Sequence, residues 1–210
     1  MTARLTLIQW LSPAFPTGAF VYSHGLEQAI ADGAVRDAAD FRDWLAGVIE
    51  FGAGWQDSVL LALSLRDGAD HAALADLALA LSPSQERLRE TAEQGAAFAR
   101  TVSALTGREI LPAPLPVAIG RAAQALALPA FEVIALALHA FASNLVTIAT
   151  RAVPLGQTEG QGVLAALHPL IAGLAERAAQ AGEEDLGNAA LCADLQAMRH
   201  ETLETRLFRT

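Results

Sequence analysis

The 210-residue chain contains no lysine, so all 14 of its basic residues are arginines, set against 23 acidic residues. The formal net charge of −9 disfavours nucleic acid and anionic membranes as partners, because both bind basic surfaces. Cys192 is the only cysteine, which excludes an internal disulfide and a cysteine-rich zinc site. The N-terminus also lacks the features of a signal peptide. We therefore expect a cytoplasmic protein.

Aromatic residues are scarce at 6%, although hydrophobic residues make up 53%, and alanine supplies much of the difference. Alanine has the highest helix propensity, and its small side chain lets helices approach closely. No repeat, low-complexity tract or long linker divides the sequence. These features predict an all-α, single-domain bundle of roughly eight to ten helices over residues 1–210.

Apolar residues recur near a 3.6-residue period from Asp37 to Leu63, which predicts one long helix with a bend at Gly52 and Gly54. The segment Phe131 to Thr150 is about long enough to span a bilayer. It contains several polar residues, however, and this favours a central buried helix of a bundle over a membrane span.

Ser82 is the expected N-cap of a helix that continues to about Leu105, because a proline and a glutamine follow at favourable positions. The apolar side of this helix nearly follows a seven-residue repeat, so it should pack along a neighbour, either internal or in a second subunit. The last helix is expected to run from about Leu186 into the terminal segment.

Three other local predictions concern turns. Two prolines and a glycine between Ser12 and Phe20 predict that residues 1–23 form an irregular N-terminal segment. Thr158 and Gln161 have capping-box spacing after Gly156, which predicts at least a helix-start turn. Pro169 should kink the helix that follows.

Known catalytic patterns are mostly missing. The chain has no phosphate-binding glycine loop, no HExxH and no GxSxG, so we expect no bound nucleotide and least favour an independent enzyme or sensor. The five histidines are scattered: His24, His71, His139, His168 and His200. His24 with Glu27, or Cys192 with His200, would share a helical face, but a pair supplies too few ligands for a tight metal site. A transient or intersubunit site remains open.

The chain ends in a dense amphipathic stretch rather than in small polar residues. Leu203, Leu207 and Phe208 would be costly to expose, while Arg206 and Arg209 carry planar guanidinium groups suited to carboxylates and carbonyls. Termini are usually disordered unless something holds them. We therefore define residues 201–210 as a C-terminal tail that either docks on a partner or folds back on its own domain.

Three separated segments together resemble the urease accessory protein UreF family. They are LSPAFPTGAFVYSHGLE (residues 11–27), PLGQTEGQ (residues 154–161) and MRHE followed by TRLFR (residues 198–201 and 205–209). The order and separations match, so the resemblance covers essentially the whole chain. The motif residues carried over are Gly156, Gln157, Thr158 and Gln161 in the turn and Arg199, His200 and Glu201 near the C-terminus.

The resemblance implies an all-helical homodimer that binds UreD (also called UreH), recruits the GTPase UreG and delivers nickel to apo-urease. It implies that the tail docks on UreD through Arg206, Leu207, Phe208 and Arg209. It also implies a dimer or UreG-facing surface near Tyr22, Ser23, His24 and Glu27. The alternative for this second segment is structural, with Ser23 capping a helix that carries Leu26 and Ile30.

The function we expect is therefore that of a non-catalytic urease maturation chaperone or scaffold, with GTP bound by UreG and no cofactor held tightly. An acidic route could pass nickel along without trapping it, because sparse carboxylates bind nickel weakly. The alternative is a GTPase-activating or GTPase-gating factor that supplies an arginine to UreG.

Overall fold

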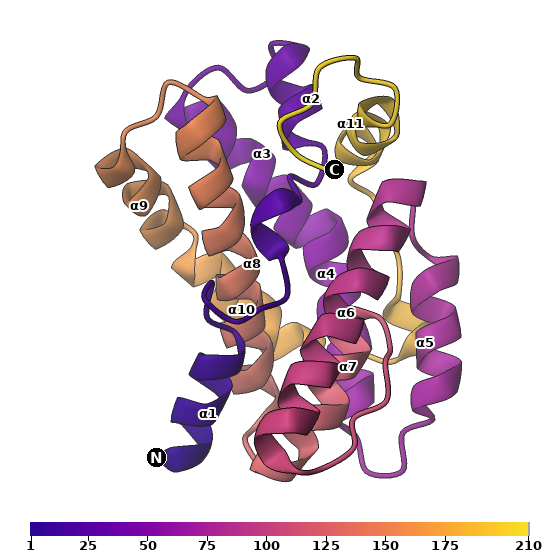
Figure 1. The fold of residues 1–210 in the computed structure, drawn as a ribbon. Helices are drawn as coiled ribbons and strands as arrows, with labels where there is room; N and C mark the ends of the chain where they lie inside the picture. Colours follow the sequence, from indigo (N-terminus) through magenta and orange to yellow (C-terminus); the bar gives the residue numbers. More distant parts are fainter. Residues whose placement is uncertain (210) are drawn as a thin grey trace.

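The computed structural model describes residues 1–209, and within them every regular element is helical (Figure 1). The described residues form eleven α-helices: α1 (Thr2–Trp10), α2 (Leu26–Ala31), α3 (Ala38–Phe51), α4 (Ala53–Leu65), α5 (His71–Ala80), α6 (Gln85–Thr106), α7 (Leu115–Ala123), α8 (Ala130–Ala152), α9 (Gln157–Ala166), α10 (His168–Ala178) and α11 (Leu191–His200). Three short 3-10 turns lie at Ala19–Val21, Gln124–Leu126 and Glu183–Asp185. The predicted all-α class is confirmed.

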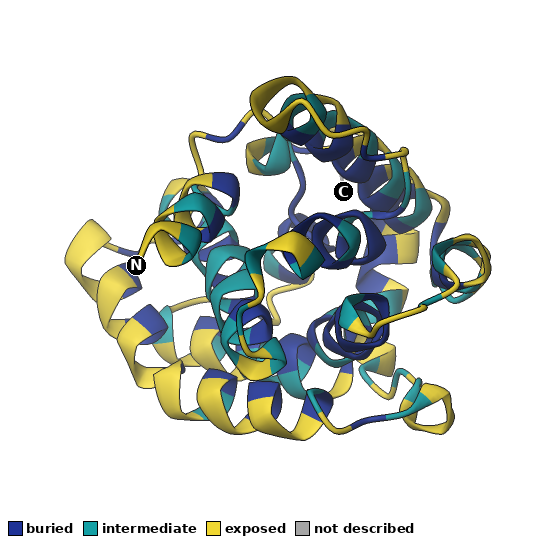
Figure 2. Cartoon of the chain, turned by 90° about the horizontal axis from the view of Figure 1, so that it is seen from below, coloured by how far each residue is buried: buried dark blue, intermediate teal, exposed yellow. Residues whose placement is uncertain are grey.

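Helices α4 and α8 form the centre of the bundle. α4 packs against α3, α5, α7, α8 and α10, and α8 also packs against α3, α9 and α10. Seen along the bundle, buried residues line the facing sides of the helices and exposed residues lie outside (Figure 2). By length and composition, α8 is the one described helix that could cross a membrane. Its inward side, which includes Ile134, Leu145 and Ile148, is buried in the core of the bundle.

Side chains cap several helices. The carboxylate of Asp37 accepts hydrogen bonds from the N–H groups of Ala39 and Asp40 at the start of α3, and Asp70 does the same for α5. At α6 the cap is Ser84, whose hydroxyl accepts from Arg87 N at 3.1 Å. The prediction of Ser82 as the cap was therefore wrong by two residues, because Ser84 has the same chemistry and lies at the helix start.

The predicted neighbour of α6 lies in the same chain. α6 packs along α7 and along the loop that precedes α7. The contact is close at Gly95, where a Cβ atom would stand 1.9 Å from the carbonyl oxygen of Ala113. Only glycine fits at this position of the helix. The packing of α6 is thus explained within one chain.

The prediction that residues 1–23 are irregular was wrong for the first half of the segment. Residues 2–10 contain no proline or glycine, and α1 forms there and buries Leu7 and Trp10. Irregular backbone begins after Leu11, where Pro13, Pro16 and a left-handed Gly18 (φ +76°) interrupt the chain.

Two predicted helices are each divided into two. The predicted bend near Gly52 is a full break, because Gly52 has a non-helical backbone (φ −116°, ψ −139°) that separates α3 from α4. The expected kink at Pro169 is a junction between α9 and α10, with the proline in the first turn of α10. The last helix begins at Leu191, five residues later than expected, because residues 186–190 form no regular structure.

Candidate functional site

His200 lies at the centre of a buried charged cluster that joins three distant helices. Its side chain is fully buried at the end of α11. Nδ1 lies 2.7 Å from Glu86 Oε2 on α6, and Nε2 lies 3.0 Å from Glu27 Oε2 on α2. Both ring nitrogens therefore face carboxylates, an arrangement that satisfies the imidazole and holds α2, α6 and α11 together.

The same two carboxylates hold the C-terminal tail. Glu27 accepts hydrogen bonds from the backbone N–H groups of Leu207 (2.7 Å) and Phe208 (3.0 Å). Glu86 Oε1 accepts from Arg206 at 2.7 Å. Phe208 is buried in the hydrophobic core, whereas Leu207 is 74% exposed. Of the two alternatives for the tail, folding back on its own domain is what the structure shows, with Leu207 left free.

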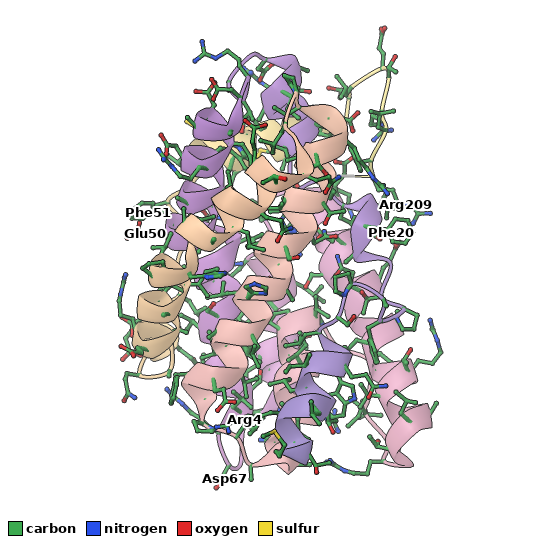
Figure 3. All side chains as sticks on the ribbon, turned by 90° about the vertical axis from the view of Figure 1, so that its left-hand side faces the viewer. Arg4, Phe20, Glu50, Phe51, Asp67 and Arg209 are labelled. Carbon is green, nitrogen blue, oxygen red and sulfur yellow. The ribbon has the colours of Figure 1, made fainter. Side chains whose placement is uncertain are left out.

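The tail ends against the segment before α2. Arg209 N donates to the carbonyl of Val21 at 2.7 Å, and its guanidinium lies 3.3 Å from Glu93 Oε2. Tyr22 donates to the same Glu93 oxygen at 2.6 Å. Burial and the bond to Glu93 raise the pKa of Tyr22 to about 12. Figure 3 shows Arg209 on the same edge of the molecule as the exposed Phe20.

The residues on either side of His200 bind the same helices. Arg199 lies 3.3 Å from Asp32, the residue that ends α2. Glu201 Oε1 accepts from the backbone N–H groups of Gln85 (2.8 Å) and Glu86 (3.4 Å), the first two residues of α6. A carboxylate is favourable there because the first N–H groups of a helix lack internal partners and carry partial positive charge. The predicted C-terminal motif therefore connects α11 to α2 and α6.

A left-handed turn brings α2 against α11. His24 and Gly25 have φ values of +55° and +80°. A Cβ atom on Gly25 would stand 2.7 Å from Ala197 N, so glycine is required by both conformation and space. Ser23 Oγ accepts from Glu27 N at 3.3 Å. The prediction of Ser23 as the N-cap was therefore wrong: the N-cap residue is Gly25, and the Ser23 hydroxyl instead accepts one hydrogen bond from the first turn of α2.

A second charged cluster joins the turn before α2 to α6 and α4. His24 Nε2 is 2.7 Å from Glu90 Oε1, and Arg87 bonds to Asp57 of α4. Burial raises the pKa of Glu90, but the charges of His24 and Arg87 outweigh it, so the pKa lies below its usual value. Burial raises the pKa of Asp57. Within residues 1–209, Glu90 Oε2 has no hydrogen-bond partner. These four side chains share the wall of a cavity of about 110 Å³.

The structure does not unite every predicted site residue. Gly156, Gln157, Thr158 and Gln161 are exposed where α9 begins, on the opposite side of the bundle from the tail (Figure 1). The capping box predicted for Thr158 was wrong: Glu159 accepts from Gly156 N at 2.9 Å, which moves the cap two residues earlier.

The two histidine pairs that the sequence disfavours as metal ligands are engaged or placed differently in the structure. His24 contacts Glu90 while Glu27 contacts His200, and Cys192 is exposed whereas His200 is buried. Over residues 1–209, no group of three or more histidine, cysteine or acidic side chains is arranged to hold a metal ion.

Four site residues on α6 were not singled out from the sequence: Glu86, Arg87, Glu90 and Glu93. The three carboxylates are spaced i, i+4 and i+7, which places them on one face of a helix. Glu86 and Glu90 are also buried, against the usual exposure of glutamate. The sequence did show an acidic stripe on one face of a helix whose other face is apolar. Such a stripe usually faces solvent, so it did not indicate a buried site.

Comparisons with known proteins agree with the motif resemblance. The sequence model of the UreF family matches residues 35–168. A protein named urease accessory protein UreF from Cereibacter sphaeroides strain KD131 is 66% identical over 208 residues, covering 99% of both chains. Proteins of the same name are 55% identical in Paracoccus denitrificans (99% of this chain, 96% of the other) and 48% identical in Dinoroseobacter shibae (100% of both).

Proposed function

The chain belongs to the UreF family of urease accessory proteins, and from this membership we propose that it acts as a non-catalytic scaffold in urease maturation. In this proposal it binds UreD through its C-terminal surface and brings UreG to the complex that loads nickel into apo-urease. A homodimer presents two such surfaces. GTP is bound by UreG and not by this chain.

The observation that carries the proposal is the tail held on Glu27, Glu86 and His200. The backbone N–H groups of residues 207–209 and the guanidinium groups of Arg206 and Arg209 are bonded internally, while the side chain of Leu207 is 74% exposed. An exposed leucine on an ordered segment is a suitable anchor for a partner, because its apolar surface gains free energy on burial at little entropic cost. The charged cluster therefore acts as the support and Leu207 as the contact.

Nickel is the proposed cargo of the assembly, not a bound cofactor of this chain. The polar groups that line the cavity next to Glu90 include two carboxylates and one imidazole, but both carboxylates are paired with Arg87. Carboxylates engaged in this way are weak nickel ligands. This favours passage of the ion over storage.

The test is co-purification of this chain with UreD and UreG from its own organism, alongside the nickel content of urease. Leu207→Asp should remove UreD capture and nickel loading while leaving the thermal midpoint unchanged. Leu105→Asp is the matched control, because Leu105 is a similarly exposed leucine at the end of α6 (57%). Capture of UreD by Leu207→Asp at the wild-type level would contradict the proposed contact, and capture of neither partner by the wild type would contradict the scaffold role.

A second candidate function is that of a GTPase-activating or GTPase-gating factor for UreG, and Arg89 favours it. Arg89 is exposed on α6, and among residues 1–209 no carboxylate pairs with it. It borders an open pocket of about 290 Å³ beside the tail, together with Arg206 and Arg209. An arginine supplied in trans needs a free guanidinium of this kind.

Arg89→Ala distinguishes the two functions. A GTPase-activating role predicts that this variant still captures UreG but fails to accelerate GTP hydrolysis. Arg100→Ala, an exposed arginine further along the same helix, is the control. Equal UreG turnover with and without wild-type protein would exclude activation and leave the scaffold.

A further inference from the structure

Two histidines that are 29 positions apart in the sequence meet on the surface between α8 and α10. The ring centroids of His139 and His168 are 5.5 Å apart, with the planes tilted by 41°. His139 is half-buried in the middle of α8, and His168 is exposed at the first position of α10. The two helices pack against each other. Both imidazoles are therefore held on regular backbone, next to solvent.

These two rings differ from the other three histidines in their hydrogen bonding. His24 contacts Glu90, His71 contacts the carbonyl of Ser64 at 2.9 Å, and His200 contacts two carboxylates. Within the described part of the chain, His139 and His168 have no hydrogen-bond partner in the protein. Their ring nitrogens remain available to a ligand.

We propose that His139 and His168 form a low-affinity site for a divalent first-row transition metal ion, with water completing the coordination. The choice of nickel as the physiological ion rests on the proposed function. Imidazole is a preferred ligand of this class of ion. At metal–nitrogen distances of about 2.0–2.1 Å, two imidazoles have ring centres about 5 Å apart on a tetrahedral ion and about 4.5 Å apart on neighbouring positions of an octahedral ion. The observed separation of 5.5 Å is within about 1 Å of both arrangements, so side-chain rotation can bring the rings onto one ion.

The environment of His139 is compatible with metal binding. Burial, followed by the proximity of His168, lowers the pKa of His139. A histidine must be neutral to bind a metal ion, so a lowered pKa reduces competition from protons. Two protonated imidazoles would repel each other, whereas two neutral imidazoles can both bind one metal ion.

The surroundings explain why the site would be weak and exchangeable. No third histidine, cysteine or acidic side chain completes a cage among residues 1–209. His168 also begins α10, where the helix N-terminus carries partial positive charge and opposes a cation. Exposed Glu176 lies on the same face of α10, about 12 Å further along the helix axis. It can attract a cation to this surface but cannot ligate an ion held by His168.

The experiment is equilibrium dialysis of the full-length, tag-free chain against Ni²⁺ alone. The wild type should bind one ion per chain in the micromolar range, and H139Q or H168Q should weaken binding about tenfold or more, as expected when one of two imidazole ligands is lost. H71Q is the matched control, because His71 is a partly exposed histidine whose ring is already bonded to Ser64. Equal binding by the wild type and the double variant H139Q/H168Q would overturn the site.

A second measurement on the wild type avoids dependence on the folding of the variants. Ni²⁺ is paramagnetic, so substoichiometric nickel should selectively broaden the imidazole resonances of His139 and His168. Selective broadening of other histidines would overturn the assignment.

The proposed function is tested separately by UreD capture and by the nickel content of urease. Loss of Ni²⁺ binding in the isolated chain with partner capture intact would reject this site alone. Failure of capture with Ni²⁺ binding retained would reject the scaffold role alone.

Discussion

Glu27 and His200 are 173 positions apart, and their side chains meet at 3.0 Å inside the protein. The same glutamate accepts the backbone N–H groups of Leu207 and Phe208. One carboxylate thus joins the start of the chain, the end of the last helix and the tail. Ordering of the tail depends on this carboxylate, and the tail is also the segment that the proposed function assigns to UreD.

Glu27→Gln should release the tail. The amide keeps the size of the side chain but replaces one acceptor oxygen by a donor, which then faces a backbone N–H or His200. Because hydrogen bonds to a charged group contribute about 1.5–3 kcal/mol, we expect a loss of about 2 kcal/mol in the free energy of unfolding. Urea unfolding measures this, and hydrogen exchange should accelerate at the amides of residues 207 and 208. Glu109→Gln, in an exposed loop, is the control. Unchanged exchange at both amides would contradict the assigned support.

Phe208 and Leu207 should respond differently to truncation. Phe208 is 9% exposed and belongs to the core, so Phe208→Ala should cost about 3 kcal/mol of unfolding free energy. Leu207→Ala should change it by less than about 0.5 kcal/mol, because that side chain is in solvent. Thermal or urea unfolding of both variants gives the comparison. Equal stabilities would mean that the tail does not pack as the structure shows.

The different environments of Phe208 and Leu207 also change which residue we expect to contact UreD. Phe208 was expected to dock on UreD, but its ring is used internally. A loss of UreD capture in Phe208→Ala would therefore follow from detachment of the whole tail, whereas a loss in Leu207→Asp would report on direct contact.

Tyr22 is the only tyrosine, so its ionisation can be followed by ultraviolet absorbance without interference. Its pKa is raised from 10.0 to about 12 by burial and by the bond to Glu93. The folded state thus favours the neutral phenol, and the stabilisation is fully present below pH 10 and is lost as the pH rises towards 12. Phenolate should appear well above pH 10 in the native protein. Glu93→Gln should lower the midpoint, and a native midpoint at 10 would contradict the geometry.

Gly25→Ala and Gly33→Ala form a matched pair. Both glycines have positive φ values, +80° and +70°. A Cβ atom on Gly33 would meet nothing within 4 Å, whereas one on Gly25 would clash with the backbone of Ala197. Gly33→Ala should lower the free energy of unfolding by about 1–2 kcal/mol, because alanine is strained at a positive φ. Gly25→Ala should cost clearly more, because α2 must also move away from α11. Urea unfolding of both variants checks this, and equal losses would show that the close approach is relaxed in solution.

The long helices could be predicted because their apolar residues repeat with helical periodicity. α6 ends one residue beyond the predicted Leu105, and α8 contains the whole segment from Phe131 to Thr150. Helix starts were harder, because several capping residues compete within a few positions. Ser82 and Ser84 offer the same hydroxyl, and at α9 the carboxylate of Glu159 caps in place of Thr158.

The charged cluster could not be predicted from local patterns. His200 meets Glu86 across 114 positions and Glu27 across 173, and no sequence spacing encodes such contacts. The motifs around Glu27 and His200 were singled out separately, but their contact depends on how α2, α6 and α11 pack. The same reason applies to His139 and His168, which become neighbours only through the antiparallel return of α10 along α8.

The bonds from the tail to Val21 and Glu27 can form only late in the synthesis of the chain. Domains begin to fold from the N-terminus while the chain is still being made. Residues 206–209 are synthesised well after Val21, Glu27 and Glu86, so these three residues lack their tail partners until the tail itself has been made. A chain that has not yet been extended through residue 209 therefore cannot form this set of bonds between the tail and Val21, Glu27 and Glu86.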